Sequence, residues 1–292
     1  MDSIKSPLFF TLDSIHFCYS CLGGIPVITV GSCNGLLCMS SALLPVFMVL
    51  NPCTGMDLKI PYPYIRYTST HIVSFYSGFG FDSIDNDYKI VLILDRHVQR
   101  RDVLVYSLNN NASKSWRLVH STSSPKELLI DHRKKAQHHH RKGVLINNHL
   151  LHWKFSCSPI EYRIACFDLE SENWVKDVPL PEYYRETTTI KHEQLHISVL
   201  DCCLCLLIRN LNEKGWDLWV MKEYGVKESW VKLFQILDPY VSDMDWKLYS
   251  LGYYGTGKDD ILFMRAVDDR GKNEQMMMIK DTLANYGFVG SE

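Results

Sequence analysis

Four cysteines near the start of the chain have a type and spacing that could bind a metal ion. Cys18 and Cys21 form a C-x-x-C pair, and Cys33 and Cys38 follow with four residues between them. Zinc ribbons use two C-x-x-C pairs to place four thiolates tetrahedrally. The second pair departs from that spacing, so we expect Cys33 and Cys38 to be small core residues of strands rather than zinc ligands.

A second group of cysteines lies in the apolar run Val199–Ile208. Alternation along a strand puts Cys203 and Cys205 on one face and Cys202 on the other. No histidine or aspartate is interleaved with them to complete a metal site. We interpret them as small apolar residues of a fully buried strand.

A histidine tract, His138–His140, lies in a strongly basic stretch. Its charged neighbours are Arg133, Lys134, Lys135, Arg141 and Lys142. Such a tract can bind metals weakly, but we interpret it as a solvated insertion between the second and third repeat. As a partner-contact loop it would favour acidic surfaces, and its positive charge would rise toward pH 6.

Acidic clusters occur late in the chain, at Asp238, Asp243, Asp245, Asp259, Asp260, Asp268 and Asp269. They lack the ligand order and central glycine of a calcium loop, so we expect solvated turns. The chain also lacks a G-x-S-x-G elbow and a phosphate-binding glycine loop. We therefore predict no catalytic, cofactor-binding or metal-binding residue, no cofactor and no enzymatic activity.

Composition narrows the classes of partner. The 292 residues carry a net charge of −2 and 46% apolar residues, which gives no sign of a nucleic-acid-binding face but allows a large core. No apolar run approaches the roughly 18 residues of a membrane helix, and no signal peptide is evident. We expect no nucleic-acid or membrane partner, reduced cysteines, and a cytoplasmic or nuclear location.

A repeat of about 57 residues organises the chain. An apolar strand, a polar turn and a tryptophan recur at Trp116, Trp174 and Trp230, which are 58 and 56 residues apart. The same step reaches Leu58 in one direction and Tyr286 in the other. Five hairpins are therefore predicted at a period a little above that of a kelch unit.

Each hairpin has an apolar stretch upstream of it. These stretches are Leu36–Met39, Tyr88–Leu94, Val144–Trp153, Cys202–Ile208 and Ile261–Met264. Glycines precede or open several of them, and we expect these glycines to supply turns or bulges; they are Gly35, Gly78, Gly80, Gly143, Gly252 and Gly257. Short helices are possible only at Ser124–Lys135 and Tyr240–Trp246.

Four strands per repeat predict an all-β chain. One such sheet cannot bury both faces, whereas radial packing of several sheets can, so we predict a β-propeller of about five to six four-stranded blades. The tryptophan after each turn would fill the gap between neighbouring blades.

Three ordered motifs resemble the F-box-associated domain of plant F-box proteins, particularly the kelch-type and S-locus F-box-like groups. They are Gly31–Cys38, Leu50–Gly55 and Gly78–Val91, and Gly143–Trp153, Phe167–Pro181 and Asp217–Lys222 continue the resemblance. The resemblance implies a propeller domain over 31–292 after a linker-like segment, 1–30. The leucine-rich leader of an F-box is not found in residues 1–30.

The resemblance implies a target receptor of an SCF-type (Skp-cullin-F-box) ubiquitin ligase. Target proteins would be its partners, with a Skp-type adaptor and cullin joining only if an F-box is supplied. An F-box-less decoy or truncated family member, and a propeller enzyme with acids or histidines around its axis, are the alternatives. No single target-binding residue is predicted, but we expect contacts from the loops Tyr62–His71, Arg96–Arg101, Leu128–Lys142 and Tyr183–His192.

Overall fold

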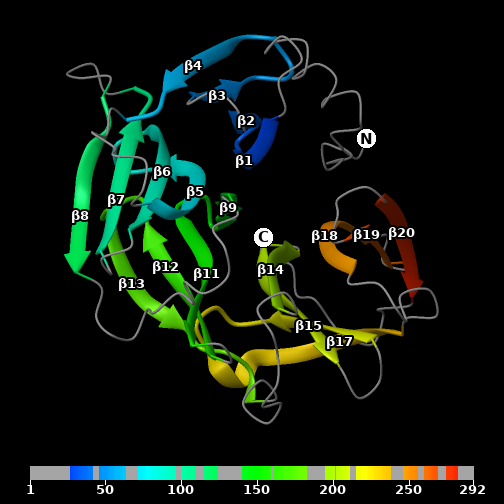
Figure 1. The fold of residues 1–292 in the computed structure, drawn as a ribbon. Helices are drawn as coiled ribbons and strands as arrows, with labels where there is room; N and C mark the ends of the chain where they lie inside the picture. Colours follow the sequence, from blue (N-terminus) through cyan, green and yellow to red (C-terminus); the bar gives the residue numbers. More distant parts are fainter. Residues whose placement is uncertain are drawn as a thin grey trace. The chain divides into compact units, whose positions relative to one another are not determined.

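Strands rich in apolar residues make up most of the described part of the chain, and a computed structural model places them in five sheets (Figure 1). The structure describes residues 27–41, 46–63, 72–96, 100–109, 115–123, 140–158, 161–182, 195–200, 202–210, 215–237, 246–255, 260–268 and 274–281. Within these ranges, no helix is both long enough and apolar enough to cross a membrane.

Strands that follow one another in the chain pair with one another, so each sheet is an antiparallel meander. Sheet A contains β1 (Val27–Cys33), β2 (Leu36–Ser41), β3 (Val46–Leu50) and β4 (Asp57–Pro61). Sheet B contains β5 (Ile72–Asp82), β6 (Asp87–Arg96), β7 (Arg100–Ser107), β8 (Arg117–Ser123) and β9 (His140–Lys142). Sheet C contains β10 (Val144–Ile146), β11 (Leu150–Ser158), β12 (Glu161–Asp168) and β13 (Asn173–Val178).

The remaining strands continue the same pattern. Sheet D contains β14 (Leu195–Leu200), β15 (Cys203–Asn210), β16 (Gly215–Met221) and β17 (Trp230–Leu237), with the short 3-10 helix η3 (Lys227–Ser229) before β17. Sheet E contains β18 (Trp246–Gly255), β19 (Asp260–Asp268) and β20 (Glu274–Asp281). The predicted upstream strands and hairpins are confirmed in sheets A to D. The hairpin position at Tyr286 and the two short helices, apart from Trp246, lie outside the described residues.

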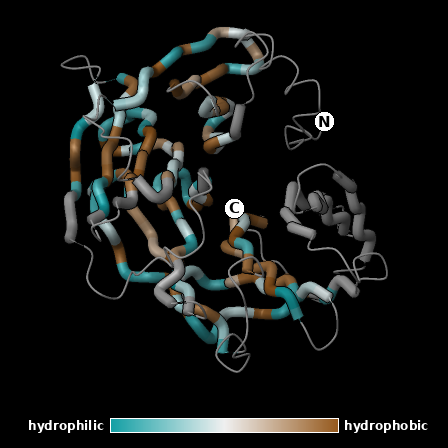
Figure 2. The backbone as a smooth tube through the Cα atoms, in the orientation of Figure 1, coloured by the Kyte–Doolittle hydropathy of each residue, from teal (hydrophilic) through white to brown (hydrophobic). Residues whose placement is uncertain are grey.

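The chain divides into two compact units. Unit 1 comprises residues 1–153 and 165–176, and unit 2 comprises residues 154–164 and 177–292. In unit 1, buried side chains of sheets A and B form one core, to which Phe47, Ile60, Phe79 and Ile90 belong. Figure 2 shows the hydrophobic stretches, in brown, that run along these strands. The predicted division at residue 30 stays a prediction.

Two of the repeated tryptophans join neighbouring sheets by the same contact. In unit 1, Trp116 precedes β8 and donates from Nε1 to the carbonyl oxygen of Pro61, at the end of β4, at 2.7 Å. In unit 2, Trp230 opens β17 and donates to the carbonyl oxygen of Pro179, directly after β13, at 2.8 Å. The predicted packing of these tryptophans between sheets is thus confirmed.

Trp174 contacts two aromatic rings, and its predicted packing between sheets stays a prediction. Its ring lies 5.3 Å from that of Phe167 and 6.2 Å from that of Trp153, both in its own sheet C. Two large aromatic side chains of one sheet therefore hold the indole edge-on within that sheet.

The predicted glycines serve two purposes. Gly35 has φ of +80° and follows Asn34 in a two-residue hairpin turn, as expected for an Asn-Gly turn. Gly78 instead lies inside β5, where an added Cβ would meet Leu151 and Trp153 within 2.9 Å. The prediction of a turn or bulge is wrong there, because the glycine is required by the close approach of the Trp153 indole.

Two further predictions need correction. Sheet B is not four-stranded, because β9 pairs in parallel with β5 through Phe75–Ser77. Cys202 is not on a strand face, because it lies in the β14–β15 turn with φ of +59° and is exposed. Cys203 and the buried Cys205 do lie in β15, as predicted.

Candidate functional site

Four short turns gather at one end of the sheets of unit 1. They are Asn34–Gly35, Ser83–Asn86, Asn147–His149 and Leu169–Glu172, and we call them the turn end of unit 1. Backbone bonds fix their mutual positions: Phe81 donates to the carbonyl of Asn148 at 2.8 Å, and Leu169 donates to that of His149 at 3.0 Å. These turns are tight because several of their residues have a positive φ, a left-handed conformation that asparagine adopts readily. They include Asn34, Asn86, Asn147 and Asn148.

A buried lysine holds two of these turns together. Lys89 is 2% exposed, and its Nζ lies 2.5 Å from Asp82 Oδ2, 2.8 Å from Glu172 Oε1 and 3.0 Å from the Leu169 carbonyl oxygen. Arg117 donates through its two terminal nitrogens to both carboxylate oxygens of Glu172 and shares Oε1 with Lys89. We call Lys89, Asp82, Glu172 and Arg117 the Lys89 network.

Each charge in the Lys89 network is held in its ionised form by its partners. Burial raises the pKa of Asp82, but the hydrogen bond from Lys89 and those from backbone amides outweigh it, so the pKa lies below its ordinary value. Burial also raises the pKa of Glu172, but the hydrogen bonds and charges of Arg117 and Lys89 outweigh it, so this pKa too lies below its ordinary value. Burial lowers the pKa of Lys89, but its two carboxylate partners raise it above the ordinary value. The network therefore fixes sheet B against the β12–β13 turn.

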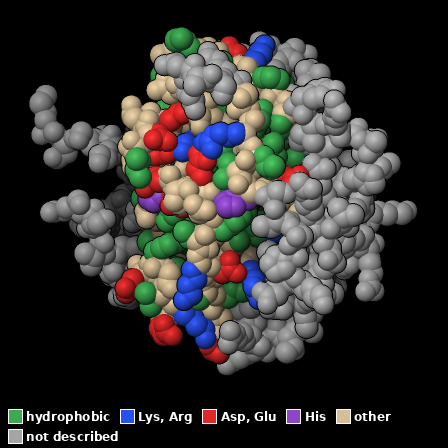
Figure 3. Space-filling view, turned by 90° about the vertical axis from the view of Figure 1, so that its left-hand side faces the viewer, with side chains coloured by type: hydrophobic (Ala, Val, Ile, Leu, Met, Phe, Trp, Pro, Cys, Tyr) green, Lys and Arg blue, Asp and Glu red, His purple; other side chains and the backbone are tan. Residues whose placement is uncertain are grey.

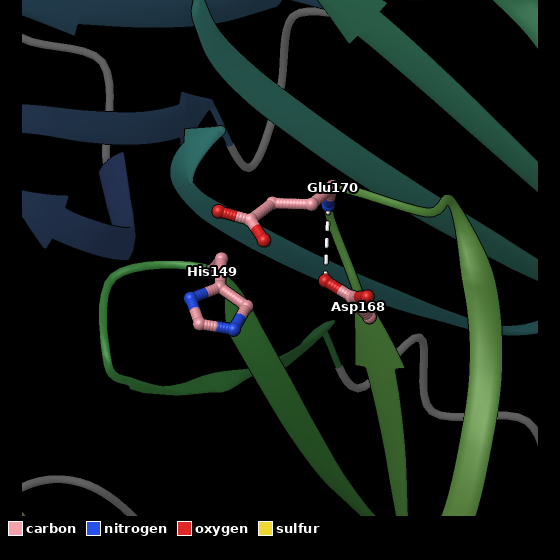
Figure 4. Close-up of side chains that lie close together, drawn as sticks. All are labelled: His149, Asp168 and Glu170. Atoms are coloured by element: carbon pink, nitrogen blue, oxygen red, sulfur yellow. Dashed lines mark hydrogen bonds between the residues drawn. The ribbon is translucent and has the colours of Figure 1, made fainter. Parts of the chain in front are cut away.

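Three side chains with metal-binding chemistry lie next to the Lys89 network. His149, Asp168 and Glu170 are half-buried, and one ligand atom of each lies within 4.8 Å of the others. Figure 4 shows the imidazole and the two carboxyl groups approaching one another from the β10–β11 and β12–β13 turns. We call them the histidine–carboxylate cluster.

An open pocket lies on sheet B close to the same turns. It has a volume of about 430 Å³ and is lined by Phe81, Asn86, Asp87, Tyr88, Leu108 and Asn109. The Tyr88 ring stacks against that of Phe79 at 5.7 Å, which provides a firm aromatic wall. Ile84 is 74% exposed at the tip of the β5–β6 turn. The turn end thus offers an apolar contact point near a mixed aromatic and polar pocket.

Charges of both signs share the described surface of the strands. Figure 3 shows basic and acidic side chains side by side rather than in patches of one sign. Arg117 and Glu172 are one such pair.

The predicted contact loops lie largely outside the described residues. Within them the structure describes the ends of three loops, residues 62–63, 96 and 100–101, and 140–142, and nothing of Tyr183–His192. His138, His139 and the basic residues Arg133–Lys135 also lie outside, as do Asp238, Asp243, Asp245, Asp259 and Asp269. Asp260 and Asp268 are the end residues of β19. Two parts of this prediction are wrong, because Arg101 is buried and His140–Lys142 form strand β9 instead of a loop. The other contact residues stay a prediction.

The cysteine predictions can be followed in sheets A and D. Cys33 and Cys38 are buried free thiols in β1 and β2, as expected for core residues, whereas Cys18 and Cys21 lie outside the described residues. Burial raises the pKa of the Cys33 thiol to about 11 and that of Cys38 further. Burial likewise raises the pKa of Cys205. These thiols are poor nucleophiles near neutral pH.

Sequence reasoning missed the Lys89 network and the histidine–carboxylate cluster. Their members come from turns up to 90 residues apart, and no fixed spacing connects them. The available signal was local: Asp82 and Asp168 are polar residues at strand ends, the positions from which a carboxylate can accept from turn amides. Only the folded arrangement brings the turns together.

Comparison with known proteins identifies the family to which this architecture belongs. The family model of the F-box associated beta propeller domain matches residues 12–286. The F-box protein CPR1 of Arabidopsis thaliana is 33% identical over 231 residues, which cover 74% of this chain and 54% of that protein. An F-box/kelch-repeat protein of the same plant is 28% identical over 209 residues, covering 71% of this chain and 52% of that protein. The chain thus spans about half the length of these curated relatives.

Among solved structures, a mutant of AofleA from Arthrobotrys oligospora aligns with a TM-score of 0.46 at 7% identity, covering 91% of this chain and 73% of that one. The beta-propeller domain of Cps50 (Swd1) aligns with a TM-score of 0.33 at 11% identity, covering 87% and 74%. The match to the family description confirms the predicted β-propeller and the resemblance drawn from the motifs. The chain belongs to the F-box associated beta propeller domain family.

Proposed function

We propose that this chain binds target proteins as the recognition part of an SCF-type ubiquitin ligase. The observation that carries the proposal is the family match over residues 12–286, together with relatives that are named F-box proteins. In this role the chain holds a protein partner and performs no catalysis. The Skp-type adaptor and the cullin join through an F-box.

The turn end of unit 1 gives this function a concrete surface. Its turns are fixed by backbone bonds and by the buried Lys89 network, so little conformational entropy is lost when a partner binds. Ile84 supplies an exposed apolar anchor, and the pocket beside Tyr88 can receive a partner side chain. The contact loops predicted from the sequence are the competing surface.

Affinity capture with paired variants tests both the function and the surface. The tagged chain is expressed in plant tissue with a proteasome inhibitor, and captured proteins are quantified. We expect a captured protein whose abundance falls when the chain is expressed behind an F-box, and recovers with the inhibitor. Ile84→Asp should reduce its capture at least about 10-fold, the loss of one anchor residue. Leu118→Asp is the control, because Leu118 is 54% exposed and lies on β8, outside the four turns.

The loop hypothesis makes a different prediction in the same experiment. Replacing Arg133, Lys134 and Lys135 by alanine should weaken capture and its salt dependence if the basic loop contacts the partner, and Arg141 and Lys142 are kept because they lie in β9. Unchanged capture in this variant removes the loop hypothesis, and unchanged capture in Ile84→Asp removes the turn end. A captured target without adaptor or cullin, and with unchanged abundance, would favour the decoy alternative. Failure to capture any protein that responds in abundance would contradict the proposal.

A further inference from the structure

The histidine–carboxylate cluster has an unbalanced charge. Asp168 and Glu170 lie together with His149, and no Lys or Arg of the described residues pairs with either carboxylate. Glu172, two residues further on, has both Lys89 and Arg117 as partners. Since two carboxylates at this distance repel each other, a cation between them would be strongly favoured. We propose that the cluster binds one divalent transition-metal ion, of which Zn²⁺ is the representative.

His149 is oriented to act as a ligand. Its Nδ1 lies 2.6 Å from the carbonyl oxygen of Asn147. A carbonyl oxygen only accepts, so Nδ1 must carry the proton and donate it. The lone pair of Nε2 is then free for a metal, which is the usual arrangement of a ligating histidine.

The two carboxylates are oriented by a surrounding shell of donors. Asp168 Oδ1 accepts from the Glu170 amide at 3.0 Å, and its Oδ2 accepts from Ser171 Oγ at 2.7 Å. Ser83, from the β5–β6 turn, donates to Glu170 Oε1. Each carboxylate oxygen keeps a further lone pair, since an oxygen of this kind accepts two bonds. In protein metal sites, the ligating carboxylates accept hydrogen bonds from outer-shell groups, and the donors to Asp168 and Glu170 correspond to such groups.

The backbone holds the ligand-bearing turns in place. The carbonyl of His149 accepts from Leu169, and that of Asn148 accepts from Phe81. An added Cβ at Gly80 would meet the Asn148 carbonyl oxygen at 2.7 Å, so only glycine allows this approach. The metal needs ligand atoms about 3.4 Å apart, given bonds of about 2.1 Å. Rotation of the longer Glu170 side chain can close the present spacing.

The ligand set defines the class of metal. One imidazole nitrogen and two carboxylate oxygens suit Zn²⁺ or Mn²⁺, whereas Mg²⁺ and Ca²⁺ prefer oxygen ligands alone. Three protein ligands leave the fourth position of a tetrahedral ion to water. The bound ion would join the β10–β11 turn to the β12–β13 turn and so stabilise the turn end.

Zinc titration of the intact chain tests the site. The protein is treated with a chelator, and Zn²⁺ binding is measured by calorimetry while the melting temperature is followed. Other histidines and the ten cysteines of the chain also bind Zn²⁺, so the signal is the difference between variants. Glu170→Gln retains the side-chain size and an acceptor for Ser83. It should bind one Zn²⁺ fewer than the wild type, with loss of the associated rise in melting temperature.

Three further variants make the outcome decisive. Ser83→Ala should weaken the same site about 10-fold without abolishing it, because it removes an orienting donor. Glu223→Gln, which removes one exposed charge in unit 2, should bind as the wild type does. His149→Gln should match Glu170→Gln. Equal stoichiometry and affinity in the wild type and Glu170→Gln would overturn the proposal, whatever the outcome of target capture.

Discussion

Two aspartate–lysine pairs, one in each unit, both have a buried carboxylate but differ in the exposure of the lysine and in what they connect. In unit 1, Asp82 and Lys89 are 0% and 2% exposed, and the lysine also reaches Glu172 in another sheet. In unit 2, Asp217 on β16 pairs with Lys232 on β17 at 2.7 Å and accepts from Asn210 on β15 at 3.3 Å, all within sheet D. Lys232 is 35% exposed. The first pair therefore connects two sheets and is buried on both sides, while the second joins strands of one sheet and its lysine is partly exposed.

The largest expected effect separates these two pairs. Lys89→Met leaves the Asp82 carboxylate buried without its ammonium group, which should lower the free energy of unfolding by about 3–5 kcal/mol. Lys232→Met leaves Asp217 with Asn210 and with water that enters beside it, so a loss of about 1–2 kcal/mol is expected. Urea unfolding at pH 7 measures both.

A double variant tests whether the loss in Lys89→Met comes from the unpaired Asp82 charge. Asp82→Asn with Lys89→Met removes both charges of the pair and should recover part of the stability lost in Lys89→Met alone. Equal losses for Lys89→Met and Lys232→Met would show that burial and the contact between sheets do not distinguish the two pairs.

Lowering the pH should reduce the stability of unit 1 in two stages. His152 is 0% exposed, and burial lowers its pKa to about 4, from 6.5. The unfolded chain therefore takes up the proton first, so stability falls as the pH drops from about 6.5 to about 4, by roughly 3 kcal/mol in all. Protonation of Asp82 and Glu172 follows at lower pH, because their pKa values lie below the ordinary range.

Removing the histidine isolates the second stage. His152→Leu should make the free energy of unfolding nearly independent of pH between about 6.5 and 5, while the loss at lower pH remains. Adding Lys89→Met should then reduce that remaining loss, since the carboxylates no longer have the partner that keeps them ionised. A slope between pH 6.5 and 5 that persists in His152→Leu would contradict the assignment.

The smallest effect should be the same in both units. Trp116→Phe and Trp230→Phe each keep an aromatic ring but remove the donor to the Pro61 or Pro179 carbonyl. Each should cost about 0.5–1.5 kcal/mol, the usual net contribution of one hydrogen bond. A difference of several kcal/mol between these variants, measured by urea unfolding, would mean that the repeated contact is not equivalent in the two units.

The sequence predicts the repeated parts of this molecule better than its connections. The apolar stretches and the spaced tryptophans are local patterns, and they located the strands and hairpins of sheets A to D correctly. Gly78 was misinterpreted because its requirement comes from Trp153, 75 residues away. The histidine–carboxylate cluster could not be predicted because His149 and Glu170 meet only after two turns of one sheet are brought together.

Strand β9 affects the tendency of the chain to associate with copies of itself. A sheet edge with unpaired amides and carbonyls can recruit a strand from another molecule. By pairing with Phe75, Tyr76 and Ser77, residues His140–Lys142 occupy that position on β5. This short, positively charged segment thus covers an edge that would otherwise favour intermolecular β-assembly, and shortening it should expose the protein to aggregation.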